Sequence, residues 1–186
     1  RNGMAVTALF RILVGEIKAD AGTFTFGQTI TTGYLPVNNE DYFNTKNDLL
    51  DWLHQYSPSD MDDTDVRGFL GKMLFSGDEI KKKASVLSGG EKVRCMLSRM
   101  MIAGANVLIV DEPTNHLDLE SIQAFNNSLT NFPGTVLFTS HDHTFTQTVA
   151  TRIVELTPSG CVDKMMQYDD YIETEKIQEQ LEGMYA

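Results

Sequence analysis

The sequence is poor in cysteine, in basic residues and in long apolar runs. Each shortage excludes a class of protein. Its two cysteines, Cys95 and Cys161, are too few for a disulfide framework and favour a reducing cytosol. No stretch approaches the roughly 18 unbroken apolar residues of a membrane span, and no signal-peptide pattern stands at its start. We therefore expect a cytoplasmic protein without direct membrane insertion.

The balance of charge is acidic. Against 26 Asp and Glu the sequence has only 15 Lys and Arg, which gives a formal net charge of −11. An acidic surface argues against broad binding to the phosphate backbone of a nucleic acid, although a narrow basic patch stays open. With 186 residues, the chain has the length of about one domain and can bury a real core.

The second half of the sequence alternates between strand-like and helix-like segments. The runs "NVLIVD", "GTVLFTS" and "RIVEL" are strand-like, and amphipathic segments separate them. This alternation predicts a parallel sheet covered by helices. In such sheets ligands bind at the carboxyl ends of the strands. Asp111 and Glu112 end one predicted strand, and Ser140 and His141 end the next, so both pairs are expected at one edge.

The first half is predicted to be mostly helical after a strand-rich start. A helix is expected to end at Gly15, and residues 22–37 are expected to form short strands joined by turns around Gly27 and Gly33. From about residue 44 apolar residues recur at helical spacing. They are Leu49, Leu50, Leu53 and Tyr56, then Val66, Phe69, Leu70, Met73 and Leu74, then Val93, Met96, Leu97, Met100 and Met101. The charged tail, residues 168–186, is expected to be a solvated helix.

The string "LSGGE" at residues 87–91 allows two interpretations. Ser88 followed by Glu91 is a capping box that opens an amphipathic helix. In addition, Gly89 and Gly90 would leave backbone N–H groups open to a bulky anion at the positive end of the helix dipole.

The acidic pair and the histidine also have a structural and a functional interpretation. Asp111 and Glu112 are either solvated acids at a strand end, or a Mg²⁺ ligand and a group that orients or deprotonates a water. A lone histidine such as His141 is usually structural. Its expected place at the same sheet edge as Asp111 favours a functional role.

Together and in this order, these strings resemble the ATP-binding-cassette (ABC) ATPases. "LSGGE" is similar to the family signature, "VLIVDE" to its Walker B strand, "NHLD" to its D-loop, and His141 to its switch histidine. "DEPTNHLD" further resembles the ABC-F branch, whose proteins carry two cassettes in one chain, and of which many act on ribosomes. The resemblance implies a P-loop NTPase-like α/β fold with a parallel sheet flanked by helices and an inserted helical signature subdomain. The core would comprise residues 1–43 and 87–168, the helical subdomain residues 44–86, and a charged C-terminal helix residues 169–186.

The first residues match a phosphate-binding loop by position but not by chemistry. In the pattern G-x-x-x-x-G-K-[ST], Ala5 stands where glycine is expected, Val6 where lysine is expected, and Thr7 where the Mg²⁺ hydroxyl is expected. Asn2 and Gly3 fill variable positions, and Ala8 follows. Val37 replaces the glutamine that the family places after "YLP", although Asn38 could partly substitute. Because the family's preceding strands have no counterpart, we expect a fragment truncated at its front.

The resemblance assigns the roles as follows. The chain would be the second cassette of an ABC-F ATPase, with ATP and Mg²⁺ as cofactors and a head-to-tail cassette, and possibly the ribosome, as partners. Catalysis would fall to Glu112 and His141, metal binding to Thr7 and Asp111, and nucleotide binding to Asn2, Gly3, Ala5, Val6, Thr7, Ala8, Ser88, Gly89, Gly90, Glu91 and Asp118. Two rivals stay open: a transporter motor domain, and a non-hydrolysing interaction or regulatory domain, which Ala5, Val6 and Val37 favour.

Overall fold

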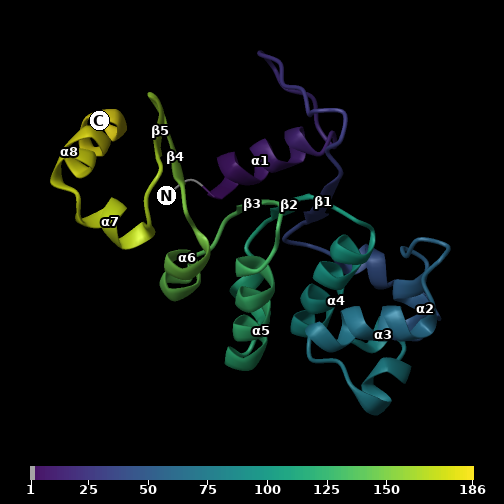
Figure 1. Ribbon diagram of the computed structural model, residues 1–186. Helices are drawn as coiled ribbons and strands as arrows, with labels where there is room; N and C mark the ends of the chain where they lie inside the picture. Colours follow the sequence, from purple (N-terminus) through teal and green to yellow (C-terminus); the bar gives the residue numbers. More distant parts are fainter. Residues whose placement is uncertain (1–2) are drawn as a thin grey trace. The chain divides into compact units, whose positions relative to one another are not determined.

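The computed structural model describes residues 3–186, apart from the side chain of His116, as an α/β fold (Figure 1). The chain divides into two compact units. One unit comprises residues 24–139, and the other comprises residues 1–23 and 140–186. Each unit is described by itself below.

The unit formed by residues 24–139 contains a parallel sheet with the order β1-β2-β3. Its strands are β1 (Thr32–Leu35), β2 (Val107–Val110) and β3 (Thr135–Phe138). Strand β2 lies in the middle, and its four apolar side chains are all buried. Figure 1 shows α4 (Gly89–Ile102) and α5 (Leu119–Thr130) on one side of this sheet. The parallel sheet with flanking helices that the alternation predicted is therefore confirmed.

The predicted strand-rich segment at residues 22–37 is only partly correct. Among these residues only β1 is a strand, and Gly33 lies inside it rather than at a turn. A Cβ atom at Gly33 would stand 2.9 Å from the Met100 side chain of α4. The glycine is therefore needed for the close approach of the strand to the helix, which local sequence alone does not indicate.

The helical part of the same unit buries the apolar faces that the sequence predicted. It consists of α2 (Leu49–His54), α3 (Asp63–Lys72) and α4. Leu49, Leu53, Val66, Leu70, Met73, Met96 and Leu97 are completely buried there. Leu74 differs from the expectation: it follows α3 with φ = 63° and is 38% exposed. The helix ends before this position, so its side chain leaves the apolar face.

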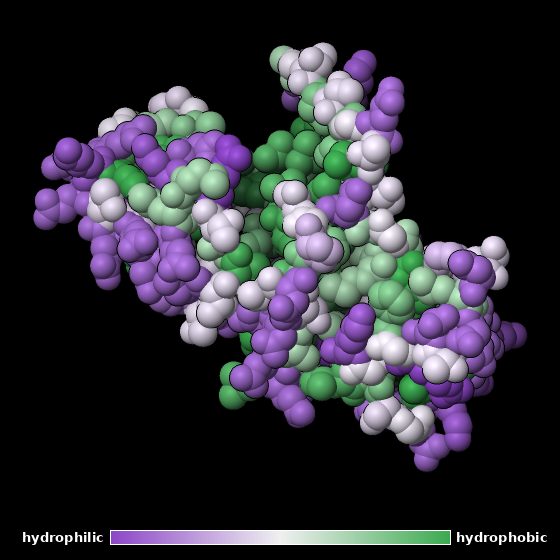
Figure 2. All heavy atoms as spheres, in the orientation of Figure 1, coloured by the Kyte–Doolittle hydropathy of each residue, from purple (hydrophilic) through white to green (hydrophobic). Residues whose placement is uncertain are grey.

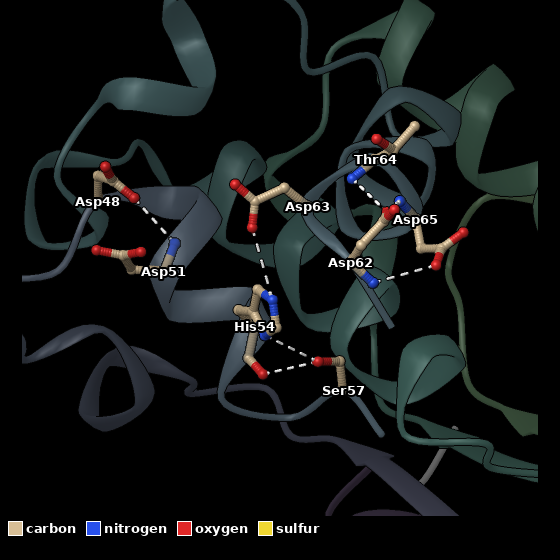
Figure 3. A network of polar contacts seen from close by, with 8 residues as sticks. All are labelled: Asp48, Asp51, His54, Ser57, Asp62, Asp63, Thr64 and Asp65. Carbon is tan, nitrogen blue, oxygen red and sulfur yellow. Dashed lines mark hydrogen bonds and ion pairs between the residues drawn. The ribbon is translucent and has the colours of Figure 1, made fainter. Parts of the chain in front are cut away.

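Short polar contacts fix where α2 and α3 begin (Figure 3). The Asp48 carboxylate accepts from the Asp51 N–H at 2.9 Å, and Asp62 accepts from the N–H groups of Thr64 and Asp65. His54 Nε2 lies 3.6 Å from the Asp63 carboxylate, which joins the end of α2 to the start of α3. The bonds to Asp48 and Asp62 satisfy helix N–H groups that have no partner within the helix.

Within residues 3–186, short 3₁₀ helices connect the larger elements: η1 (Glu40–Phe43), η2 (Gly77–Lys81), η3 (Ala84–Val86) and η4 (Pro113–His116). The first of them is anchored to α2 and α4 by aromatic contacts. The Trp52 indole stacks on Phe43 with ring centroids 4.7 Å apart and donates to the Tyr42 carbonyl at 2.7 Å. The Arg99 guanidinium lies 4.6 Å from the centre of the Tyr42 ring. The segment after β1 is thus held by the helical part of the unit.

The other unit contains α1 (Gly3–Leu13), α6 (His143–Val149), β4 (Ile153–Thr157), β5 (Gly160–Lys164), α7 (Tyr168–Glu173) and α8 (Glu175–Tyr185). The expected helix before Gly15 is α1, and Gly15 has φ = 82°. Strand β4, the predicted "RIVEL", pairs antiparallel with β5 and not with the parallel sheet. The expectation that this strand joins the alternating parallel pattern is therefore wrong.

The charged tail is two helices with a buried side, and not one solvated helix. Tyr171, Ile177 and Leu181 pack with Val162 of β5 in a small apolar cluster. The hydroxyl groups of Tyr171 and Tyr185 both donate to the Glu155 carboxylate of β4, at 3.0 and 2.8 Å. Figure 2 shows hydrophilic residues over the outer surfaces of α7 and α8 and of α2 and α3. Within residues 3–186, no helix is long and apolar enough to cross a membrane.

Candidate functional site

Asp111 and Glu112 follow β2 directly, at the carboxyl edge of the parallel sheet, as the pattern predicted. Asp111 is 2% exposed, and its N–H donates to the Leu35 carbonyl of β1 at 2.9 Å. The central strand and its neighbour therefore fix the backbone that carries the acidic pair. A carboxylate this buried requires hydrogen-bond donors, because desolvation of the charged form is costly.

Thr139 provides one such donor, and the sequence did not single it out. Its hydroxyl donates to Asp111 Oδ1 at 2.7 Å and accepts from the Glu112 N–H at 2.9 Å. Thr139 stands at the end of β3, the strand beside β2 in the sheet. One hydroxyl thus holds both acidic residues, so the end of β3 is part of the same polar group. In the sequence, the role of Thr139 is indicated only by its position as a polar residue directly after the neighbouring strand.

Glu112 has an unusual backbone conformation. Its φ of 49° and ψ of 53° lie in the left-handed region, which is uncommon for a residue that has a Cβ. Such strain of about 1–3 kcal/mol persists where the surroundings enforce it, and it concentrates at functional sites. Here η4 begins with Pro113 immediately after Glu112. The chain turns sharply at Glu112, so the side chains of Asp111 and Glu112 need not follow the alternation of a strand.

The start of α4 is the capping box that "LSGGE" predicted. The Glu91 N–H donates to Ser88 Oγ at 3.3 Å, the Glu91 carboxylate accepts from the Ser88 N–H at 2.7 Å, and Lys82 Nζ lies 2.9 Å from the same carboxylate. Burial acts to raise the pKa of Glu91, but the bonds from Ser88 and Lys82 outweigh it and leave the pKa below its ordinary value. Ser88 and Gly89 are exposed, so the first turn of α4 is open to a ligand.

Asp118 caps α5 and belongs to the same unit. Its carboxylate accepts from the Ser121 N–H at 2.8 Å, and this bond lowers the pKa of Asp118. The cap explains why an acid stands at this position, since a carboxylate at a helix start is stabilised by the N–H groups and the dipole. The contact to a facing cassette that the resemblance implies for Asp118 stays a prediction.

The residues of the altered phosphate-binding loop lie at the start of α1, in the other unit. Gly3, Ala5, Val6, Thr7 and Ala8 are all helical there, and Asn2 lies outside the described residues. A helix start after the loop is what the phosphate-binding pattern requires. The Val6 side chain carries no charge, so it cannot supply the cation expected at this position.

His141 also lies in this second unit, just before α6. It is exposed. Asp142 is the cap of α6, because its carboxylate accepts from the Phe145 N–H at 2.8 Å. The local structure gives His141 no capping function of its own, and its role as a switch residue stays a prediction.

The residues fit a magnesium nucleotide in part. No group of three or more His, Cys, Asp or Glu side chains within residues 3–186 could hold a metal ion. Mg²⁺ does not need such a cage, because in nucleotide sites it is held by one or two carboxylates, phosphate oxygens and water. The buried Asp111 suits this arrangement. Val37, 51% exposed after β1, has no ligand atom for a metal.

Comparisons with known proteins agree with this architecture. A sequence profile of the ABC transporter family matches residues 1–115. The chain is 59% identical over its whole length to the uncharacterized ABC transporter ATP-binding protein YkpA of Bacillus subtilis, and 31% identical over 91% of its length to the energy-dependent translational throttle protein EttA of Escherichia coli K12. It spans 35% and 32% of these two proteins, about a third of their length.

A solved structure shows the same fold. The RNase-L inhibitor superimposes with a TM-score of 0.74 and 20% sequence identity, over 99% of this chain and 42% of that one. The family match covers more than half of the residues and includes β1, α4, β2 and the acidic pair. The chain therefore belongs to the ABC transporter family of ATP-binding domains, and it has the P-loop NTPase-like fold of that family.

Proposed function

We propose that this chain is an ATP-binding and ATP-hydrolysing cassette of an ABC-F protein that acts in translation. The observation that carries the proposal is the edge of the parallel sheet, where Thr139 holds Asp111 and Glu112 together by bonds of 2.7 and 2.9 Å. Attack of water on a γ-phosphate requires a group that holds the metal ion and a group that orients the water. The buried Asp111 carboxylate suits the first role, and the neighbouring Glu112 carboxylate, on its strained backbone, suits the second.

Each residue has a defined part in the proposed reaction. Asp111 would hold a Mg²⁺ ion through water, and the family resemblance assigns Thr7 a metal-binding hydroxyl. Glu112 would orient the attacking water and accept its proton, and the family resemblance assigns His141 to the γ-phosphate. The ion, when bound, neutralises the charge that develops on the phosphate oxygens. Ser88, Gly89, Gly90 and Asp118 serve the nucleotide of a facing cassette.

The translational setting rests on similarity. The motif "NHLD" resembles the ABC-F branch, and EttA is named as a translational throttle. Relatives about three times as long as this chain are consistent with a second cassette in the same protein. We propose the second cassette of such a pair, with the ribosome as partner and the cytoplasm as setting.

A second candidate function is a nucleotide-independent interaction or regulatory domain. Ala5 and Val6 support it, because the loop has neither the second glycine nor the lysine that cradle phosphates. Losing one charge-assisted contact costs about 1.5–3 kcal/mol, or ten- to hundredfold in affinity. The capping box at Ser88 is intact, however, which supports the proposal that this cassette serves a nucleotide bound elsewhere.

The test uses Glu112→Gln in the full-length protein. An amide keeps the shape and hydrogen bonding of the side chain but is not a useful base, so ATP should still bind while turnover falls about 10²–10⁴-fold. Glu120→Gln, an exposed acid in the first turn of α5, is the matched control and should leave turnover unchanged. A loss below about threefold would remove the catalytic assignment of Glu112.

The same variant separates the translational setting from a transporter motor. Glu112→Gln with ATP should remain in the closed state and sediment with ribosomes, whereas the same protein without nucleotide should not. Sedimentation that is identical with and without ATP would contradict a nucleotide-driven ribosomal function.

A further inference from the structure

Thr139 contacts three consecutive residues at the end of β2, and the proposed reaction gives it no part. Its backbone N–H donates to the Val110 carbonyl at 3.0 Å. Its hydroxyl donates to Asp111 Oδ1 at 2.7 Å and accepts from the Glu112 N–H at 2.9 Å. These residues all belong to the unit formed by residues 24–139. The end of β3 therefore fixes the course of the chain where the acidic pair leaves β2.

The direction of the hydroxyl proton follows from these two bonds. A threonine hydroxyl has one proton to donate and two lone pairs that accept. Since a lone pair receives the Glu112 N–H, the proton is directed to Asp111 Oδ1. A β-branched side chain is also stiff about χ1. Thr139 therefore holds the Asp111 carboxylate, which is 2% exposed, in one orientation.

The bond from Glu112 fixes the peptide plane between the two acidic residues. Glu112 has φ = 49° and ψ = 53°, and Pro113 follows it. A residue before a proline prefers extended backbone with φ of about −120°, and a residue with a Cβ avoids the left-handed region. Without the Thr139 acceptor this plane is free to turn, so Glu112 can relax toward extended backbone. Such a change displaces the Glu112 carboxylate.

We propose that Thr139 is a positioning residue for ATP hydrolysis. It acts through its two partners: it keeps Asp111 in the orientation proposed to hold the metal ion, and Glu112 in the orientation proposed to activate the water. The inference rests on the proposed function of the acidic pair. Displacing a catalytic group by about 1 Å can lower a rate about a hundredfold. Loss of the hydroxyl should therefore lower turnover and leave ATP binding nearly unchanged.

The test compares two variants of the full-length protein. Thr139→Val keeps the shape and removes the hydroxyl, whereas Thr139→Ser keeps the hydroxyl. The turnover that belongs to this site is the difference between the wild-type rate and the rate of Glu112→Gln. Thr139→Val should lower this turnover about 10- to 100-fold, and Thr139→Ser should stay within about threefold of wild type. Thr135→Val, at the exposed start of β3, is the matched control and should leave the rate unchanged.

Equilibrium binding separates positioning from loss of folded protein. Titration with a fluorescent ATP analogue gives the dissociation constant and the number of sites. For Thr139→Val both should stay within about twofold of wild type, because an interaction that acts only in the transition state lowers kcat and not binding. A loss of sites in the same proportion as turnover would mean partial unfolding and would contradict the inference. Circular dichroism verifies the helix content of each variant.

Hydrogen exchange of the nucleotide-free protein measures the local cause. Mass spectrometry of peptides from residues 107–118 includes the amide of Glu112, whose bond to Thr139 requires the hydroxyl. Exchange in this segment should be faster in Thr139→Val, and unchanged in Thr139→Ser and Thr135→Val, because an amide without its acceptor opens more easily.

Three further results would overturn the inference. A Thr139→Val rate within about threefold of wild type, while Glu112→Gln loses turnover, would mean that the acidic pair works without the hydroxyl. Equal losses in Thr139→Val and Thr139→Ser would assign the effect to packing of the side chain. A wild-type rate in Glu112→Gln would remove the proposed function itself, and the role of Thr139 with it.

Discussion

At the scale of single residues, Thr139 links the two acidic residues of the candidate site. Its hydroxyl both donates to Asp111 and accepts from the Glu112 N–H. Asp111 is almost fully buried, so the loss of a donor leaves part of a charged group unsatisfied. The strain at Glu112, with φ = 49°, is also held in place by this bond.

We therefore predict that Thr139→Val, which keeps the shape of the side chain, lowers the free energy of unfolding by about 1–3 kcal/mol. Urea denaturation of the chain measures it. Thr135→Val, at the exposed start of the same strand, removes a hydroxyl for which the structure shows no bond within residues 3–186, and should change stability by less than about 0.5 kcal/mol. Equal effects of the two changes would show that the Thr139 bonds contribute nothing.

Asp111 and Glu112 could be placed from the sequence, whereas Thr139 could not. The acidic pair follows an unbroken apolar run, and such a run in an alternating sequence indicates a buried parallel strand. Thr139 acts across 28 positions of sequence separation, and its importance depends on the register between β2 and β3. No local pattern encodes that register. The left-handed conformation of Glu112 could not be predicted from the sequence either, because glutamate does not normally adopt it.

At the scale of elements, the capping box of α4 makes the stability of this helix depend on pH. Bonds from the Ser88 N–H and from Lys82 outweigh burial and hold the pKa of Glu91 below its ordinary value of 4.5. A carboxyl whose pKa is depressed in the folded state stabilises it above the unfolded pKa, and this contribution is lost as pH falls through the folded pKa.

Glu91→Gln should therefore destabilise the protein at neutral pH and have progressively less effect as pH falls below 4.5. Thermal unfolding of the variant and of the wild-type chain across this range measures the difference. Glu120→Gln, an acid at the start of α5 for which no partner is present within residues 3–186, serves as the control. A destabilisation by Glu91→Gln that does not vary with pH would mean that packing, rather than the charge, is responsible.

Helices were easier to predict than strand pairing. Most of the periodic apolar residues predicted for α3 and α4, such as Val66, Leu70, Met96 and Leu97, are buried, because helical spacing and burial are linked within one element. The partner of β4 is β5, a short strand with Cys161 and Lys164 among its five residues and little apolar character. Its pairing depends on the turn before Gly160, which has φ = 138°, and on the packing of Val162 against Ile177 and Leu181 of α8. Gly33 inside β1 likewise depends on Met100, far along the chain.

At the scale of the whole molecule, the chain combines an altered phosphate-binding loop with an intact helix cap at "LSGGE". Val6 stands where a lysine would contact the phosphates, and Ala5 stands where a glycine would let backbone approach them. The two motifs serve different nucleotides in the proposed function, so a defect in one does not imply a defect in the other. The chain by itself should bind Mg·ATP weakly.

Restoring both residues, Ala5→Gly with Val6→Lys, should tighten Mg·ATP binding by the chain about ten- to hundredfold, because one charge-assisted contact is regained. Isothermal titration calorimetry measures the affinity. Leu9→Lys places the same charge on an exposed position of α1 and should leave the affinity unchanged. If both variants bind as weakly as the wild-type chain, Val6 is not at a phosphate position.

The anchoring of Trp52 gives the molecule an optical reporter of its own. It is the only tryptophan of the sequence, it is 1% exposed, and its ring is stacked on Phe43 while its N–H donates to Tyr42. Indole emission responds to the polarity and rigidity around the ring. Any rearrangement of residues 40–43 would therefore change a fluorescence signal from one known position. No label has to be attached to observe it.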